Sequence, residues 1–285
     1  MVWQQIINGI ATGSIYALIA LGLTMVYGVL RILHIAHAAI YALGAYLGLV
    51  TYLRTGNLAL ALLGAVAGCA LVGFLVQRLL YRPLITLSPM VPLIASIGLF
   101  ILMEDLFRLV AGPYEMPFPV EMALGPIEFF GIFITASQGL VLIVALIILI
   151  LLWFLIDKTR LGLGWQASAQ DLEMAQAMGI NTNQIVAVNF LIGSALAALA
   201  GVLVGIYYNS VYPTMGSTPA YKALAIIVLG GLGSAAGTVV ASMFLGLTET
   251  ILVGVTGFFL PRDAIAFLFL IIMLMIRPRG ILGRV

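Results

Sequence analysis

Long apolar stretches without charged residues dominate the sequence and predict membrane-spanning helices. Because the hydrocarbon core of a bilayer is ~30 Å thick, a spanning α-helix needs about 20 predominantly apolar residues. Stretches that meet this requirement cover residues 3–30, 32–53, 58–76, 89–112, 139–156 and 184–208. Later stretches, at residues 221–233, 238–255 and 264–276, are shorter or contain a charge. The pattern predicts an all-α, polytopic transmembrane helical bundle with about eight or nine membrane segments, some of them short or broken helices.

Glycines four residues apart recur within these stretches and predict close packing between helices. The pairs are Gly9/Gly13, Gly44/Gly48, Gly64/Gly68 and Gly201/Gly205. Small residues at this spacing let helix backbones approach one another where lipid supplies no hydrophobic drive for association. The sequence gives no sign of a separate water-soluble domain, and we expect residues 1–285 to form a single transmembrane domain.

The composition supports a membrane location. Charged residues make up 8% of the chain and apolar residues 64%, whereas soluble domains contain about 25% and about 45–50%. These residues cannot cover a core with a polar surface, so we expect membrane lipid to be the outer solvent. The net charge of +2, with few lysines, argues against a nucleic-acid partner.

Basic residues near the ends of the predicted spans indicate an orientation, because they favour the cytoplasmic side. They form three groups: Arg78 with Arg82, Lys158 with Arg160, and Arg277 with Arg279 and Arg284. The connection over residues 110–137 has no Lys or Arg and carries Glu115, Glu121 and Glu128. We therefore expect this connection and the N-terminus outside, in a multi-pass protein of a plasma membrane.

Sequence motifs of common enzymes and nucleotide-binding proteins are absent. The sequence has no Walker-type phosphate loop, no H-E-x-x-H and no G-x-S-x-G. A dinucleotide-like pattern, Gly231-x-Gly233-x-x-Ala236, lies between membrane segments rather than in a soluble strand–turn–helix unit. A glycine-rich helix break is the better interpretation. We expect neither an enzyme nor a cofactor bound by this chain.

Two histidines at the start of the second stretch, His34 and His37, share one helix face. Zinc takes three or four ligands, and no carboxylate or cysteine nearby completes such a set. Hydrogen-bonded helix packing and a position lining a solute pathway remain the two main interpretations. The single cysteine, Cys69, cannot form an intrachain disulfide.

Charged residues within the spans need partners, because unpaired charges in a bilayer are energetically expensive. Glu104 and Arg108 are four residues apart and can form an interfacial ion pair. Glu249 has no local partner. We expect it to pair with Lys222, and the alternative is a place on a solute pathway.

The hydrophilic connection over residues 157–184 predicts an amphipathic cytoplasmic helix. Trp165, Ala169 and Leu172 would form one apolar stripe, while Glu173 would face elsewhere. Gly179 is a suitable C-terminal stop. Because this helix is acidic, whereas interfacial lipid anchors are usually basic, we expect it to contact a protein partner.

Several stretches together resemble a known family. Glu173-Met-Ala175-Gln-Ala-Met-Gly179 is similar to the E-A-A-x-x-x-G element through which permeases of bacterial ABC importers contact their ATPases. Residues 8–18, 179–182 and 222–237, the last with the core V-L-G-G-L-G-S, resemble the branched-chain amino acid permeases of the LivH type. Residues 34–39 depart from this pattern: they read H-I-A-H-A-A, where the family usually has N-F-A-H-G-E.

The resemblance implies a permease subunit of an ABC importer in a bacterial inner membrane, carrying branched-chain or other small hydrophobic amino acids. Its expected partners are a second permease subunit, two ATP-binding subunits that hydrolyse ATP, and a periplasmic solute-binding protein. The permease pair could be homodimeric or heterodimeric. The alternatives are a related importer for urea, an amide, a sugar or an aromatic acid, and a self-sufficient secondary carrier.

Overall fold

The computed structural model describes residues 2–120, 125, 127–129, 132–256, 262–276 and 280–281. Glu121 and the basic residues Arg277, Arg279 and Arg284 lie outside the described residues. The helices are α1 (Val2–Leu30), α2 (His37–Thr55), α3 (Leu58–Val76), the π-helix η1 (Gln77–Tyr81), α4 (Arg82–Leu84), α5 (Met90–Ala111), α6 (Ala136–Lys158), α7 (Arg160–Gln170), α8 (Leu172–Ala177), α9 (Thr182–Tyr208), α10 (Ser217–Gly230), α11 (Ala235–Thr256) and α12 (Arg262–Ile276). Strands β1 (Ile127–Phe129) and β2 (Ile132–Ile134) form an antiparallel hairpin.

The predicted transmembrane helical bundle is confirmed. Within the described residues, 6 helices are long and apolar enough to cross a membrane: Trp3–Leu30, Leu58–Leu84, Met90–Ala111, Ala136–Lys158, Thr182–Tyr208 and Ala235–Gly254. The second predicted span, residues 32–53, is not among these helices, and its helix α2 starts later than expected, at His37. Helices α10 and α12 are shorter apolar helices. The number of spans stays a prediction.

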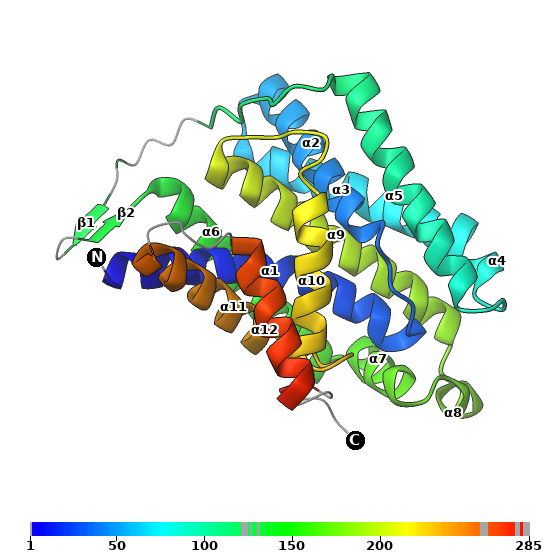
Figure 1. Ribbon diagram of the computed structural model, residues 1–285. Helices are drawn as coiled ribbons and strands as arrows, with labels where there is room; N and C mark the ends of the chain where they lie inside the picture. The colour runs from blue at the N-terminus through cyan, green and yellow to red at the C-terminus, as the bar shows by residue number, and fades with distance from the viewer. Residues whose placement is uncertain are drawn as a thin grey trace.

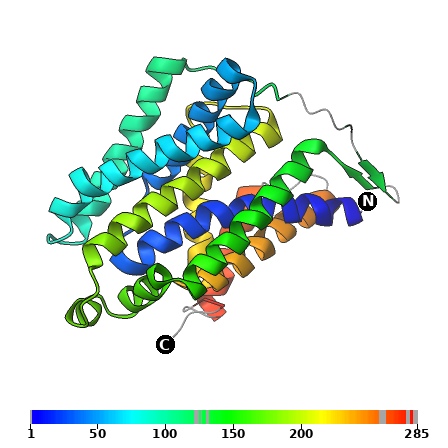
Figure 2. The ribbon, with the colours of Figure 1, turned by 180° about the vertical axis from the view of Figure 1, so that it is seen from behind.

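Helices α1 and α9 form the centre of the bundle, and α3, α5 and α6 lie at its periphery (Figures 1 and 2). The central helices are mostly covered by other helices, whereas the peripheral ones expose most of their apolar side chains. Such an apolar exterior suits contact with lipid.

The glycine pairs bring helices together as expected. Gly9 and Gly13 pack against the backbone of α11 at Met243 and Leu247. Gly201 of α9 packs so closely on α2 that an added Cβ would collide with the carbonyl oxygen of Tyr41. Close backbone approach therefore fixes the positions of α2 and α11 around the two central helices.

The bundle has two distinct ends, which we name by their contents. The hairpin end carries β1, β2, the N-terminus and the start of α6, and the coupling end carries α7 and α8 (Figure 1). Helix α1 runs from the hairpin end to the coupling end, and α9 runs back. Strand β2 and residues 157–184 thus lie at opposite ends of the bundle, and the side of the membrane on which each connection lies stays a prediction.

Helices α2 and α10 both begin inside the bundle rather than at its surface. His37, at the start of α2, lies 3.1 Å through its Nε2 from the carbonyl oxygen of Ile19, near the middle of α1. Gly216, directly before α10, packs against the carbonyl of Ala38. The two helix starts therefore meet at the level of the middle of α1, and the segments leading to them enter the bundle as non-helical chain.

Replacing Gly201 with Ala tests whether the α2–α9 contact is as tight as the structure indicates. Overpacking a buried contact typically lowers stability by about 1–3 kcal/mol, so we expect Gly201→Ala to lower the thermal unfolding temperature of the protein in detergent. Gly98→Ala on α5 is the matched control, because open space surrounds Gly98. Equal unfolding temperatures for the two variants would contradict the close contact.

Candidate functional site

A buried ion pair joins α10 to α11. The Nζ of Lys222 lies 3.0 Å from both carboxylate oxygens of Glu249. The two residues expose 2% and 1% of their surface, so neither charge is solvated by bulk water. The structure thus brings together the two residues that the sequence suggested as partners.

Tyr16 and Asp263 extend this pair into a network that sequence reasoning missed. Lys222 Nζ donates to the Tyr16 hydroxyl at 2.8 Å, and that hydroxyl donates to Glu249 Oε2 at 2.9 Å. Asp263 Oδ1 lies 3.2 Å from Lys222 Nζ. The network therefore links α1, α10, α11 and α12. We name Tyr16, Lys222, Glu249 and Asp263 the charge cluster.

Sequence reasoning missed Tyr16 and Asp263 because neither residue has a neighbour in the sequence that points to a buried ion pair. Tyr16 lies in an uncharged span, where a tyrosine is expected to pack against neighbouring helices. Asp263 follows Arg262 at the edge of the last apolar stretch, where a neighbouring basic residue is the obvious partner. Only the fold shows that Asp263 reaches Lys222.

A cavity of about 700 Å³ opens next to the charge cluster, which lies within the size range of small-molecule sites. Its apolar wall comes from α1 and α9 and the segment before α10, through Ile15, Ile19, Val204 and Met215. Tyrosines from the charge cluster, α2 and the end of α9 add hydroxyl groups: Tyr16, Tyr41, Tyr208 and Tyr212. The cavity thus combines an apolar wall with polar groups.

The polar groups of this cavity come from several elements. Lys222 and Asp263 of the charge cluster line it, as does Glu115 from the connection after α5. Thr218 and Pro219 place the first turn of α10 at the cavity wall. Ser210, in the segment that follows α9, also lines the cavity. The cavity therefore lies between the charge cluster and segments from the hairpin end.

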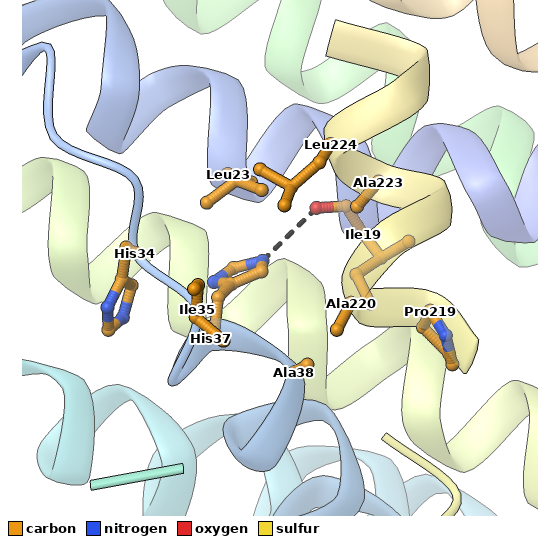
Figure 3. A pocket seen from close by; sticks show the side chains of 10 residues that line it. All are labelled: Ile19, Leu23, His34, Ile35, His37, Ala38, Pro219, Ala220, Ala223 and Leu224. Atoms are coloured by element: carbon orange, nitrogen blue, oxygen red, sulfur yellow. Dashed lines mark hydrogen bonds between the residues drawn. The ribbon is translucent and has the colours of Figure 1, made fainter. Parts of the chain in front are cut away.

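A second, much smaller pocket lies beside the two histidines (Figure 3), and we name this pocket the constriction. It encloses a space of only about 10 Å³, roughly the room that one water needs. Its lining shares Ile19 and Pro219 with the cavity, and adds Leu23, Ala220, Ala223 and Leu224. Apolar side chains of α1 and α10 therefore form much of the lining of the constriction.

His34 and His37 both line the constriction, with their ring centres 5.8 Å apart. His34 Nδ1 is hydrogen-bonded to the hydroxyl of Tyr81 at 2.7 Å, and His37 Nε2 donates to the carbonyl of Ile19 at 3.1 Å. Tyr81 comes from η1, a π-helical turn of the kind often found at functional sites.

The remaining nitrogens, His34 Nε2 and His37 Nδ1, are buried without a hydrogen-bond partner among the described residues. Within that part of the chain, no three His, Cys, Asp or Glu side chains gather in a way that could hold a metal ion. Hydrogen-bonded packing is thus present at both histidines, and a position lining a solute pathway stays a prediction.

The pair of Glu104 and Arg108 lies on α5, apart from the charge cluster. Arg108 contacts Glu104 at 2.7 Å and also Asp105 at 2.8 Å. About half of the Arg108 side chain is exposed, which suits an interfacial ion pair.

The connection over residues 157–184 corrects one expectation: it forms two helices rather than one. The backbone of Asp171 is extended and ends α7, and the Asp171 side chain then caps α8 by accepting from the N–H of Met174. The single apolar stripe through Trp165, Ala169 and Leu172 is therefore wrong, because the break at Asp171 changes the direction of the chain.

Trp165 faces the bundle, since it is buried and its Nε1 donates to the carbonyl of Met25 at 3.1 Å. Ala175 is also buried, and Ala169 and Leu172 are partly buried. Glu173 is exposed on α8, together with Met174 and Met178. Gly179 has a φ of 85° and ends α8 as expected.

Comparison with known proteins identifies the relatives of this chain. Residues 5–277 match the family described as "Branched-chain amino acid transport system / permease component". The chain is 36% identical to the "High-affinity branched-chain amino acid transport system permease protein BraD" of Pseudomonas aeruginosa, over 99% of this chain and 95% of that protein. It is 34% identical to the protein of the same description named LivH in Escherichia coli, with the same coverage.

More distant similarities extend this result. The Escherichia coli protein LivM, described as a permease protein of the same high-affinity system, is 28% identical over 84% of this chain and 61% of LivM. The solved structure "PsaBC from Streptococcus pneumoniae in complex with Fab" aligns with a TM-score of 0.52 at 16% identity, over 98% of this chain and 91% of that one. At this identity the structural likeness supports the fold alone.

Removing one partner of the buried pair tests the electrostatics of the charge cluster. Glu249→Gln leaves Lys222 with one carboxylate fewer, and breaking a buried pair typically lowers stability by about 3–5 kcal/mol. We expect a lower yield of folded protein and a lower unfolding temperature in detergent. The double variant Glu249→Gln with Lys222→Met removes both charges and should recover part of the loss.

Glu104→Gln is the control, because Arg108 keeps its contact with Asp105. A double variant as damaged as the single one would show that the pairing does not stabilise the fold.

Proposed function

This chain belongs to the family of branched-chain amino acid transport permeases, and on that premise we propose that it forms the pathway by which branched-chain or other small hydrophobic amino acids cross a bacterial inner membrane. The observation that carries the proposal is the cavity beside the charge cluster, at the point where α2 and α10 begin inside the bundle. Transporter binding sites typically lie where discontinuous helices meet near the bilayer midplane.

The sequence of spaces along the bundle supports a pathway. The cavity is large enough for a small solute, whereas the constriction at His34 and His37 has room for about one water. A solute that enters from the hairpin end would therefore stop in the cavity until α1 and α10 separate at Leu23 and Leu224. We assign the hairpin end to the periplasmic side.

We propose that the chain works as one subunit of an ABC importer. The Escherichia coli relatives LivH and LivM are described as permease proteins of one transport system, and this chain resembles both. A second, different permease subunit is therefore the expected partner. Two ATP-binding subunits would supply the energy and a periplasmic binding protein the solute, and this chain would bind no cofactor.

The two alternatives make different demands. An importer for urea, an amide, a sugar or an aromatic acid would keep the fold and change the delivered solute. A self-sufficient carrier would need an ionisable residue that couples transport to an ion gradient. Glu249, the residue that suited this role, is bound to Lys222 and Tyr16, which weakens the carrier hypothesis.

The structure suggests how the ATPase would act on the pathway. Trp165 of α7 donates a hydrogen bond to the carbonyl of Met25, near the C-terminal end of α1. Helix α1 also provides Leu23 to the constriction. Helix α8 exposes Glu173, Met174 and Met178 at the coupling end. A partner that binds α8 would therefore transmit force through α7 to the part of α1 that lines the constriction.

Uptake by a reconstituted complex tests the proposed function. The permease pair, the ATP-binding subunits and the binding protein are placed in vesicles, and uptake of radiolabelled leucine is measured with and without ATP. We expect uptake that requires both ATP and the binding protein. Uptake driven by an ion gradient without ATP would contradict the importer and support the carrier.

Met174 gives a sharper test of the coupling surface than Ala175, because its side chain is 58% exposed whereas that of Ala175 is buried. Met174→Asp places a charge on the surface where the ATPase would bind. Removing a central interface contact typically weakens binding by about 2 kcal/mol or more. We expect normal membrane insertion but reduced co-purification of the ATP-binding subunits and reduced uptake.

Met174→Leu keeps the apolar contact and should retain both properties. If Met174→Asp co-purified and transported as well as Met174→Leu, α8 would not be the docking surface.

A further inference from the structure

The charge cluster holds more negative than positive charge. Lys222 carries one positive charge, and Glu249 and Asp263 carry two negative charges around it. Glu115 adds a further carboxylate to the wall of the same cavity. Glu249 is buried, whereas Asp263 is half-exposed and Glu115 is exposed, so salt in solution screens part of this excess without changing its sign. The cavity therefore has an electrostatic preference for a cationic group.

The charge that a solute can reach in the charge cluster is a carboxylate. The ammonium of Lys222 is occupied by Tyr16, Glu249 and Asp263, and its side chain is only 3% exposed. The Asp263 side chain is 47% exposed and offers carboxylate oxygen to the cavity. Asp263 can thus accept a hydrogen bond from a solute while Lys222 stays in place.

Ser210 is another polar residue that lines the same cavity. Ser210 is 8% exposed, and its Oγ has no hydrogen-bond partner within the part of the chain that the structure describes. The first turn of α10 lies at the same cavity through Thr218 and Pro219. A helix N-terminus carries partial positive charge, and a hydroxyl can donate to an anion. These groups complement a carboxylate.

We propose that this cavity binds the zwitterionic head of an aliphatic α-amino acid, with the ammonium group at Asp263 and the carboxylate at Ser210 and the N-terminus of α10. The apolar wall formed by Ile15, Ile19 and Val204 would receive the aliphatic side chain. The inference rests on the proposed transport function and goes further, because it gives the permease itself a means of recognising the head group.

Recognition by the permease has a chemical consequence. A solute without an ammonium group would leave the excess negative charge of the charge cluster uncompensated. Neutral sugars and urea would donate hydrogen bonds to Asp263 but bring no compensating positive charge, and carboxylic acids without an amino group would be repelled by it. The permease would therefore act as a second filter after the binding protein.

Protection of a cysteine in the cavity measures binding to the permease directly. The assembled complex, without binding protein, carries Val204→Cys in a Cys69→Ala background, and its labelling by a small neutral thiol reagent is timed. The probes are leucine, 3-methylbutylamine, which lacks the carboxylate, and 4-methylpentanoate, which lacks the ammonium group. We expect leucine to protect best, the amine next, and the acid least.

Two substitutions should affect different probes. A lost hydrogen bond to a charged group weakens binding about tenfold or more. Asp263→Asn should raise the concentration of leucine and of the amine needed for protection by about that factor. Ser210→Ala should weaken protection by leucine and leave the amine unchanged. Asp105→Asn is the matched control, because Asp105 lies on α5 beside Arg108 and away from the cavity.

The outcomes are distinct. The inference is overturned if the acid protects as well as leucine in the unaltered cavity, a comparison that does not depend on whether Asp263→Asn folds. It is also overturned if no probe protects while ATP-dependent leucine uptake continues, a result that would leave the proposed function intact. Absence of ATP-dependent leucine uptake by the unaltered complex would instead refute the proposed function.

Discussion

The arrangement around the pathway depends on one interaction: the contact of Lys222 with two carboxylates inside the bundle. A lone ammonium or carboxylate buried in a bilayer is unfavourable by roughly 2.5–3.5 kcal/mol or more, so Lys222 and Glu249 require each other. Their pairing holds α10 against α11, and the half-exposed Asp263 adds a contact from α12. Tyr16 extends the constraint to α1 at the centre of the bundle.

The same interaction explains how a short helix can help form a pathway. Helix α10 begins inside the bundle, where Gly216 lies against Ala38, and the bond from Lys222 to α11 holds it there. Its first turn then faces the cavity, while Leu224, further along, closes the constriction against α1. In the proposed function, solute recognition and closure would therefore involve one helix, and a force on α1 through Trp165 would act on the closed part.

The sequence was sufficient for those features that depend on local chemistry. Apolar stretches predicted the spans, glycine pairs predicted the close contacts of α1 and α9, and the lack of a local partner for Glu249 pointed to Lys222. Features that depend on tertiary contacts could not be predicted. The roles of Tyr16 and Asp263 require knowledge of which helices are neighbours, and the break at Asp171 arises because a polar side chain caps a new helix where the periodic pattern suggested continuity.

The central claim is that solute passes between α1 and α10, through a constriction that must open. A reversible cross-link tests it most directly: Leu23→Cys and Leu224→Cys, in a Cys69→Ala background, place one thiol on α1 and one on α10, at two residues that line the constriction (Figure 3). ATP-dependent leucine uptake is measured before oxidation, after oxidation and after reduction. The account predicts that the disulfide abolishes uptake and that reduction restores it, whereas full uptake by the cross-linked complex would contradict a pathway between these helices.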